Sequence, residues 1–128
     1  MKTIIQTPNA PAPIGPYNQA IRYGNTVYLS GQIGLNPGTM EWVSDSIEAE
    51  TEQVMQNLLA VLEAAQLTFE KVVKSTIFLS DMDHFAEVNT VYGRYFDEKS
   101  APARETVAVK TLPKSVRVEI SMIAVDDA

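Results

Sequence analysis

Two charged residues near the end of the chain, Arg104 and Glu119, are the side chains best suited to chemistry. A guanidinium binds a small carboxylate through two parallel charge-assisted hydrogen bonds, and a nearby glutamate can move a proton. If they lie together, they predict a site that anchors an acidic substrate and exchanges a proton with it. The structural alternative is a salt bridge at a sheet edge, which contributes about 0–1 kcal/mol when exposed.

Whether Arg104 and Glu119 meet depends on how the last two expected strands pair. In an antiparallel hairpin with a two-residue turn, Arg104 lies opposite Ser121. Thr106 then lies opposite Glu119. Because side chains alternate along a strand, all four residues would share one face of the sheet. A longer connection between the strands is also possible, so this pairing is conditional.

Hydrophobic periodicity predicts the elements that position these residues. Apolar residues recur every three or four positions over residues 46–65, which is typical of a helix, and Asp83 begins a second helical pattern. Apolar and β-branched runs predict strands at residues 20–23, 26–30, 72–79, 106–110 and 116–125, the first two joined as a hairpin around Gly24 and Asn25. This order predicts one α+β domain over residues 1–128, with two helices packed on one face of a mixed sheet.

Composition argues against several classes of protein. The 128 residues include no cysteine and one histidine, which excludes disulfides, thiol catalysis and a His/Cys zinc site within one subunit. A net charge of −6 disfavours binding to nucleic acid or to anionic membranes. The sequence has no apolar run of about 18 residues and no signal-peptide pattern, so we expect a cytoplasmic protein with no membrane partner.

Seven short motifs follow one another along the chain. They are Gly15-Pro16-Tyr17, Ser30-Gly31-Gln32-Ile33, Asn36-Pro37, Asp83-His84-Phe85 with Val88-Asn89, Pro102-Ala103-Arg104, Leu112-Pro113-Lys114, and Val118-Glu119-Ile120 with Ile123-Ala124-Val125. Their order and spacing resemble the RidA family, also called YjgF/YER057c/UK114, the reactive-intermediate deaminases. The resemblance covers residues 3–125.

The resemblance implies a fold and an activity. Family members have a chorismate-mutase-like fold, and three subunits form a ring with clefts between neighbours. Members of the RidA branch hydrolyse enamine and imine intermediates released by pyridoxal-phosphate enzymes, such as 2-aminoacrylate, to 2-oxo acids and ammonia. The resemblance therefore implies a 2-iminobutanoate/2-iminopropanoate deaminase, a homotrimer with inter-subunit active sites, and no cofactor or metal.

The resemblance also implies roles for individual residues. Arg104 anchors the substrate carboxylate and Glu119 orients water and moves a proton. The expected substrate-binding residues are Tyr17, Ser30, Gly31, Phe85, Asn89, Arg104 and Thr106. The chain departs from some members in having Thr106 in place of a cysteine, so the resemblance implies that a thiol is not essential to the chemistry. It departs from many members in having Ser121 in place of a second acid, which changes the charge of the expected cleft and bears on substrate preference.

Other functions of the same fold remain open at this point. A non-catalytic regulatory or interaction protein that binds small carboxylates would use the same Arg104 anchor. A mutase acting on a substrate with two carboxylates is disfavoured, because only one arginine falls in a family motif. Some members of the family are described as acting on RNA, which the negative charge of this chain disfavours.

Overall fold

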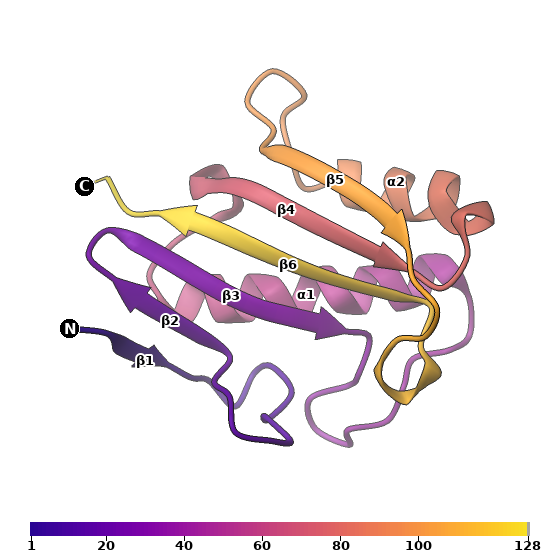
Figure 1. Ribbon diagram of the computed structural model, residues 1–128, viewed down its shortest axis with the longest axis horizontal. Coiled ribbons are helices and arrows are strands. Elements are labelled where there is room, and N and C mark those ends of the chain that lie inside the picture. Colours follow the sequence, from indigo (N-terminus) through magenta and orange to yellow (C-terminus); the bar gives the residue numbers. More distant parts are fainter. Residues whose placement is uncertain (128) are drawn as a thin grey trace.

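A six-stranded mixed sheet forms the frame of the protein in the computed structural model, which describes residues 1–127. The strands are β1 (Thr3–Ile5), β2 (Ala20–Tyr23), β3 (Thr26–Ile33), β4 (Val72–Leu79), β5 (Ala103–Ala108) and β6 (Val118–Val125). Their order across the sheet is β1-β2-β3-β6-β4-β5 (Figure 1). The β4–β5 pair is parallel and the other pairs are antiparallel. The hairpin predicted around Gly24 and Asn25 is confirmed, because Tyr23 pairs with Thr26.

Two helices, α1 (Ile47–Ala64) and α2 (Phe85–Gly93), pack on the same face of this sheet (Figure 1). The core lies between the helices and the sheet, and alternate residues of β6 contribute to it: Val118, Ile120, Met122 and Ala124 are buried. The predicted α+β architecture is therefore confirmed. Neither α1 nor α2, within residues 1–127, is long and apolar enough to cross a membrane.

The first helix follows its sequence pattern closely. Ser46 is the N-cap, and its Oγ accepts a hydrogen bond from the backbone N–H of Ala49 at 3.0 Å. The apolar stripe is fully buried, including Val54, Leu58 and Leu62. The cap and the stripe together explain why the predicted limits of α1 are confirmed to within one residue at each end.

The predicted pairing of the last two strands is wrong. The strand β5 pairs with β4 in parallel, and β4 lies between β5 and β6. Thr106 therefore pairs with Ile77 of β4, and not with Glu119. The cause is the path of the chain, since β4, α2 and β5 form a βαβ unit that places consecutive strands side by side in parallel.

Smaller differences concern where the elements begin and end. The strand β5 starts earlier than expected, at Ala103, and β6 starts later, at Val118. The strand β3 continues to Ile33 through a register shift, although the expected strand stops before the shift. The capping residue of the second helical segment is Asp81, whose Oδ1 accepts from the backbone N–H of Asp83 at 2.8 Å.

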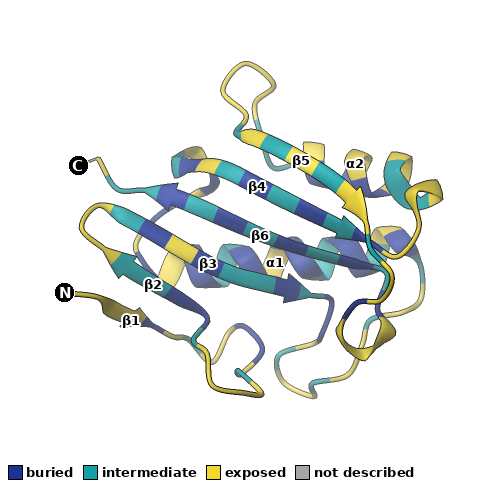
Figure 2. Cartoon of the chain, viewed as in Figure 1, coloured by how far each residue is buried: buried dark blue, intermediate teal, exposed yellow. Residues whose placement is uncertain are grey.

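The face of the sheet opposite the helices carries partly exposed residues. Figure 2 shows buried residues alternating with partly exposed ones along β3, β4 and β6. Tyr28 is 50% exposed and Val107 is 44% exposed on this face. The sheet therefore offers two chemically different surfaces to the functional residues.

Candidate functional site

Arg104 lies on the helix-covered face of the sheet, against α2. It pairs with buried Ser75 of β4, and its side chain points to the same face as that serine. Its Nη1 donates a hydrogen bond to Asn89 Oδ1 at 2.7 Å. The guanidinium carbon lies 5.7 Å from the centre of the Phe85 ring and 5.1 Å from that of Tyr92. We call Phe85, Asn89, Tyr92 and Arg104 the Arg104 platform.

The Arg104 platform orients a cation without neutralising it. Asn89 is uncharged, and the two aromatic rings stabilise the guanidinium through their π faces. Among residues 1–127, Arg104 forms no ion pair with a carboxylate. The salt-bridge alternative therefore does not apply to Arg104, and the remaining N–H groups of its guanidinium are available to an anionic ligand.

Tyr92 belongs to this platform although its sequence pattern indicated only a core residue. Its hydroxyl donates to Ser75 Oγ at 2.9 Å, and burial raises the pKa of the phenol. Phe85, Asn89 and Tyr92 follow one another at positions i, i+4 and i+7 of α2, which places them on one face of the helix. That spacing could have linked Tyr92 to the two expected binding residues.

Thr106 lies on the same face of β5 as Arg104, two residues further along the strand. Its Oγ1 is buried and has no hydrogen-bond partner among residues 1–127. A buried hydroxyl without a partner is uncommon in folded proteins. Thr106 therefore lies on β5, the strand that carries Arg104, and its hydroxyl stabilises no other described residue through a hydrogen bond.

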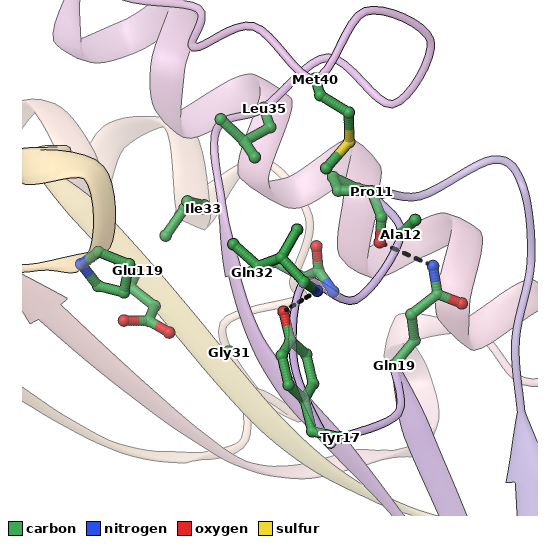
Figure 3. A pocket seen from close by; sticks show the side chains of 12 residues that line it. Pro11, Ala12, Tyr17, Gln19, Gly31, Gln32, Ile33, Leu35, Met40 and Glu119 are labelled. Carbon is green, nitrogen blue, oxygen red and sulfur yellow. Dashed lines mark hydrogen bonds between the residues drawn. The ribbon is translucent and has the colours of Figure 1, made fainter.

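Glu119 lies on the opposite face of the sheet. Its neighbours Val118 and Ile120 are fully buried toward the helices, so the Glu119 side chain points away from them. It faces a pocket, which we call the Glu119 pocket, lined by Pro11, Ala12, Ile14, Tyr17, Gln19, Gly31, Gln32, Ile33, Leu35, Met40, Pro113 and Glu119. Figure 3 shows the Glu119 carboxylate beside the Gly31 backbone, with Leu35 and Met40 at the far end.

The Glu119 carboxyl group is suited to proton transfer. Burial raises its pKa above the ordinary value for glutamate. None of the residues 1–127 forms a hydrogen bond or an ion pair with it. A half-buried carboxylate with a raised pKa and free oxygens can accept a proton from water and return it.

Gly31 makes room for this carboxylate. It lies at the register shift of β3, between Leu29 and Gln32. A Cβ atom at Gly31 would overlap Glu119 Oε2 and would come 2.9 Å from the carboxyl carbon. The absence of a side chain therefore lets the Glu119 carboxylate lie directly against the β3 backbone.

We expect Gly31→Ala to displace the Glu119 carboxylate while leaving the Arg104 platform intact. A shift of about 1 Å in a reacting group can lower a rate by about 10²-fold, so the rate of catalysis should fall by roughly this factor. Ligand affinity should stay near that of the wild type, because Arg104 is unchanged. Parallel measurements of kcat and of the affinity for a small carboxylate check this, and loss of affinity with an unchanged kcat would contradict it.

Tyr17 and Ser30 have different places near the Glu119 pocket. Tyr17 lines the pocket and is 48% exposed, and its hydroxyl accepts from the backbone N–H of Ile14 at 3.4 Å. Ser30 is not among the lining residues. Its Oγ donates to the backbone carbonyl of Asn18 at 2.5 Å. That bond attaches the loop before β2 to β3, so Ser30 supports the wall of the pocket and Tyr17 forms part of it.

Arg104 and Glu119 do not meet within one chain. Arg104 and Thr106 lie on the helix-covered face, whereas Glu119 and Ser121 lie on the other. The expectation that these four residues share a face is therefore wrong, because it depended on direct pairing of β5 with β6. A single chain therefore presents the Arg104 platform on one face of the sheet and the Glu119 pocket on the other.

Comparisons with known proteins agree with this fold. The model of the family described as endoribonuclease L-PSP matches residues 7–126. A 2-iminobutanoate/2-iminopropanoate deaminase of Dermatophagoides farinae is 49% identical, over 97% of this chain and 96% of that protein. A crystal structure of a putative endoribonuclease from Thermotoga maritima is 48% identical with a TM-score of 0.96, over 100% of both chains. RidA from the Antarctic bacterium Psychrobacter sp. is 44% identical with a TM-score of 0.91, over 96% of this chain and 98% of that chain.

Proposed function

Since this chain belongs to the endoribonuclease L-PSP family, which includes the RidA proteins, we propose that it is an imine deaminase of the cytoplasm. Its substrates are 2-iminobutanoate and 2-iminopropanoate, formed from the enamines that pyridoxal-phosphate enzymes release. Its products are the 2-oxo acids and ammonia, and the reaction uses no cofactor. The name of the Dermatophagoides farinae relative supports this activity.

The environment of the Arg104 guanidinium is the main observation that supports the proposal. The guanidinium of Arg104 is held by a neutral amide and two aromatic rings, and no carboxylate of residues 1–127 pairs with it. Such a cation suits a small carboxylate, the group that all 2-imino acids share. Glu119, with its raised pKa and free oxygens, adds the proton-transfer group that a simple carboxylate-binding protein does not need.

The complete site is an assembly of two subunits in this proposal. The Arg104 platform and the Glu119 pocket lie on opposite faces of one sheet, so a head-to-tail contact can bring the platform of one copy to the pocket of the next. Repeating that contact around a threefold axis closes a homotrimer with three equivalent sites. The partly exposed face of the sheet supplies apolar surface for the contact, including Tyr28 and Val107.

The reaction proceeds by addition of water to the imine carbon. Arg104 holds the substrate carboxylate, and ionised Glu119 accepts a proton from the water as its oxygen bonds to carbon. The substrate reacts as the protonated imine, so the electrons of the C=N bond move to nitrogen and give a neutral carbinolamine. Glu119 returns its proton to this nitrogen, the carbon–nitrogen bond breaks, and ammonia leaves. The carbonyl forms as the hydroxyl proton passes to Glu119, which releases it to water. Tyr17 and Phe85 exclude bulk water from the site, and backbone groups at Gly31 and Thr106 orient the water or the nitrogen.

A coupled assay tests the activity. A pyridoxal-phosphate dehydratase acting on threonine or serine supplies fresh imine, and release of ammonia and 2-oxo acid is followed with and without this protein. We expect the protein to accelerate release well above the spontaneous hydrolysis. Tight binding of 2-oxobutyrate with no acceleration would instead indicate a non-catalytic carboxylate-binding protein.

Mixed oligomers test the shared site. Arg104→Ala and Glu119→Gln subunits should each form inactive trimers, but their mixture should contain sites with both residues intact. Random mixing of equal amounts restores about a quarter of the wild-type sites, because each mixed trimer regains one site in three. Activity that stays at the level of the separate variants after exchange of subunits, or a monomer in light scattering, would contradict the inter-subunit site.

A further inference from the structure

Glu50, a fully buried carboxylate in the first turn of α1, has no part in the mechanism above. Its Oε2 accepts the backbone N–H of Arg117 at 2.9 Å and that of Val118 at 3.2 Å. Its Oε1 accepts from Arg117 Nε at 2.7 Å. Burying an ionised carboxylate is costly unless charged and N–H donors surround it, as they do here. The three bonds attach the start of β6 to α1.

The same helix also holds the end of β3. A Cβ atom at Gly34 would lie 2.9 Å from both Cγ and the backbone oxygen of Glu50, so β3 leads directly into a close contact with this residue. One further part of α1 adds to this attachment, since Asn57 Nδ2 donates to the carbonyls of Ile33 at 3.1 Å and of Leu35 at 3.0 Å. Thus α1 holds both strand ends that form the Glu119 pocket (Figure 1).

The loop before α1 also contacts Arg117, the ion-pair partner of Glu50. Arg117 Nη2 donates to the carbonyl of Ser44 at 2.9 Å, and its guanidinium carbon lies 5.3 Å from the centre of the Trp42 ring. Arg117 thus links the buried carboxylate of Glu50 to a second, more exposed segment. Several hydrogen bonds fix the orientation of the ion pair between Glu50 and Arg117, so this pair can hold the neighbouring segments in place.

We propose that Glu50 is a positioning residue for Glu119. By joining the start of β6 to the end of β3, it holds the Glu119 carboxylate over Gly31, in the orientation that proton transfer requires. This inference rests on the proposed function for the catalytic role of Glu119. The claim that Glu50 fixes the position of the Glu119 carboxylate does not depend on that activity.

The variant Glu50→Asp keeps the charge but shortens the side chain, so it cannot reach both backbone N–H groups and Arg117 together. We expect kcat to fall by about 10- to 100-fold, because the proton-transfer group is misplaced, while KM stays within about threefold. The matched control is Glu52→Asp on the same helix, whose carboxylate accepts from Gln56 and Tyr95 and, among residues 1–127, forms no hydrogen bond with β6. It should change kcat by less than about twofold.

A double variant separates positioning from general loss of structure. In a Glu119→Gln background, Glu50→Asp should lower kcat by less than about threefold further, since the group it positions is already absent. If Glu50→Asp alone leaves kcat unchanged, the proposal is overturned. It is equally overturned if the full 10- to 100-fold loss recurs in the Glu119→Gln background.

Titration of the Glu119 carboxyl by ¹³C NMR provides a readout without catalysis. Because Glu50→Asp preserves the charge, a fall in the pKa of Glu119 toward its ordinary value would come from a loosened, wetter pocket. We expect that fall, and an unchanged pKa would contradict the proposal. A wild-type protein without deaminase activity would remove the proposed function, but the titration would still decide whether Glu50 places Glu119.

A second variant, which leaves Glu50 itself unchanged, covers the case in which Glu50→Asp does not fold. Arg117→Gln removes the side-chain bond to Glu50 and leaves both backbone bonds. Loss of a nearby cation alone would raise the pKa of Glu119, whereas a loosened pocket lowers it. The direction of the change in this variant therefore distinguishes positioning, which predicts a fall, from a purely Coulombic effect, which predicts a rise and would overturn the proposal.

Discussion

Replacing Arg104 with alanine is expected to abolish most of the deaminase activity while leaving the protein folded. Under the proposed function, the variant loses two charge-assisted hydrogen bonds to the substrate carboxylate, each contributing about 1.5–3 kcal/mol. Together these correspond to a fall of about 10²- to 10⁴-fold in kcat/KM. Arg104 has no carboxylate partner among residues 1–127, so its removal leaves no buried acid unpaired. The measurement is kcat/KM on freshly generated imine, with circular dichroism to verify folding.

Lysine at position 104 should restore little of this activity. An ammonium keeps the charge but cannot make two parallel bonds, and it lacks the planar guanidinium that interacts with the Phe85 and Tyr92 rings. The control is Arg94→Ala, which removes an exposed arginine just after α2 and should keep kcat/KM within about twofold. An Arg104→Ala protein with the wild-type rate would show that the carboxylate binds elsewhere.

Replacing Glu119 with glutamine is expected to lower kcat by about 10²- to 10⁴-fold while retaining affinity for 2-oxo acids. The amide keeps the shape of the side chain but cannot accept a proton from water, and the Arg104 platform is untouched. In the wild type, kcat should fall as the pH decreases through the raised pKa of Glu119, because protonation removes the base. This acid limb should be absent from the pH profile of Glu119→Gln.

The same substitution should stabilise the folded protein at neutral pH. The raised pKa means that the folded state binds the proton more tightly than the unfolded state, so Glu119 favours folding at low pH. That contribution is lost as the pH rises from the ordinary glutamate value through the raised one. Thermal melts should therefore show a higher Tm for Glu119→Gln than for wild type at pH 8, with a smaller difference at pH 4. A lower Tm at pH 8 would reveal a structural salt bridge.

The expected fall in kcat and the expected rise in Tm of Glu119→Gln would have the same physical cause. A carboxylate that lies half-buried against Gly31 without a partner is costly to ionise, and that cost is what raises its pKa. A partner such as an arginine would stabilise the charge but would also make the group a weaker base. Catalytic carboxylates are commonly found in this kind of unfavourable environment.

Several features follow from local sequence alone. The apolar stripe over residues 46–65 predicted α1, and the turn at Gly24 and Asn25 predicted the β2–β3 hairpin. The alternation of apolar and polar residues along β6 matches the residues that enter the core. These succeed because capping, turn geometry and side-chain alternation depend on residues only a few positions apart.

The role of Glu50 could not be read from its local pattern. A glutamate in the first turn of a helix usually faces solvent and interacts with the helix dipole. Here the residue is fully buried, because the start of β6 brings two backbone N–H groups and Arg117 to its carboxylate. Those donors are more than sixty positions away in the chain, so no local pattern reports them.

By itself, the sequence determined the two helices, most of the strands and the identity of the residues capable of chemistry, among them Arg104 and Glu119. Only the tertiary structure decided that these two lie on opposite faces of the sheet. The reason is that strand partners are chosen by long-range packing: β4 inserts between β5 and β6, and this intervening strand removes the direct pairing on which a shared face depended.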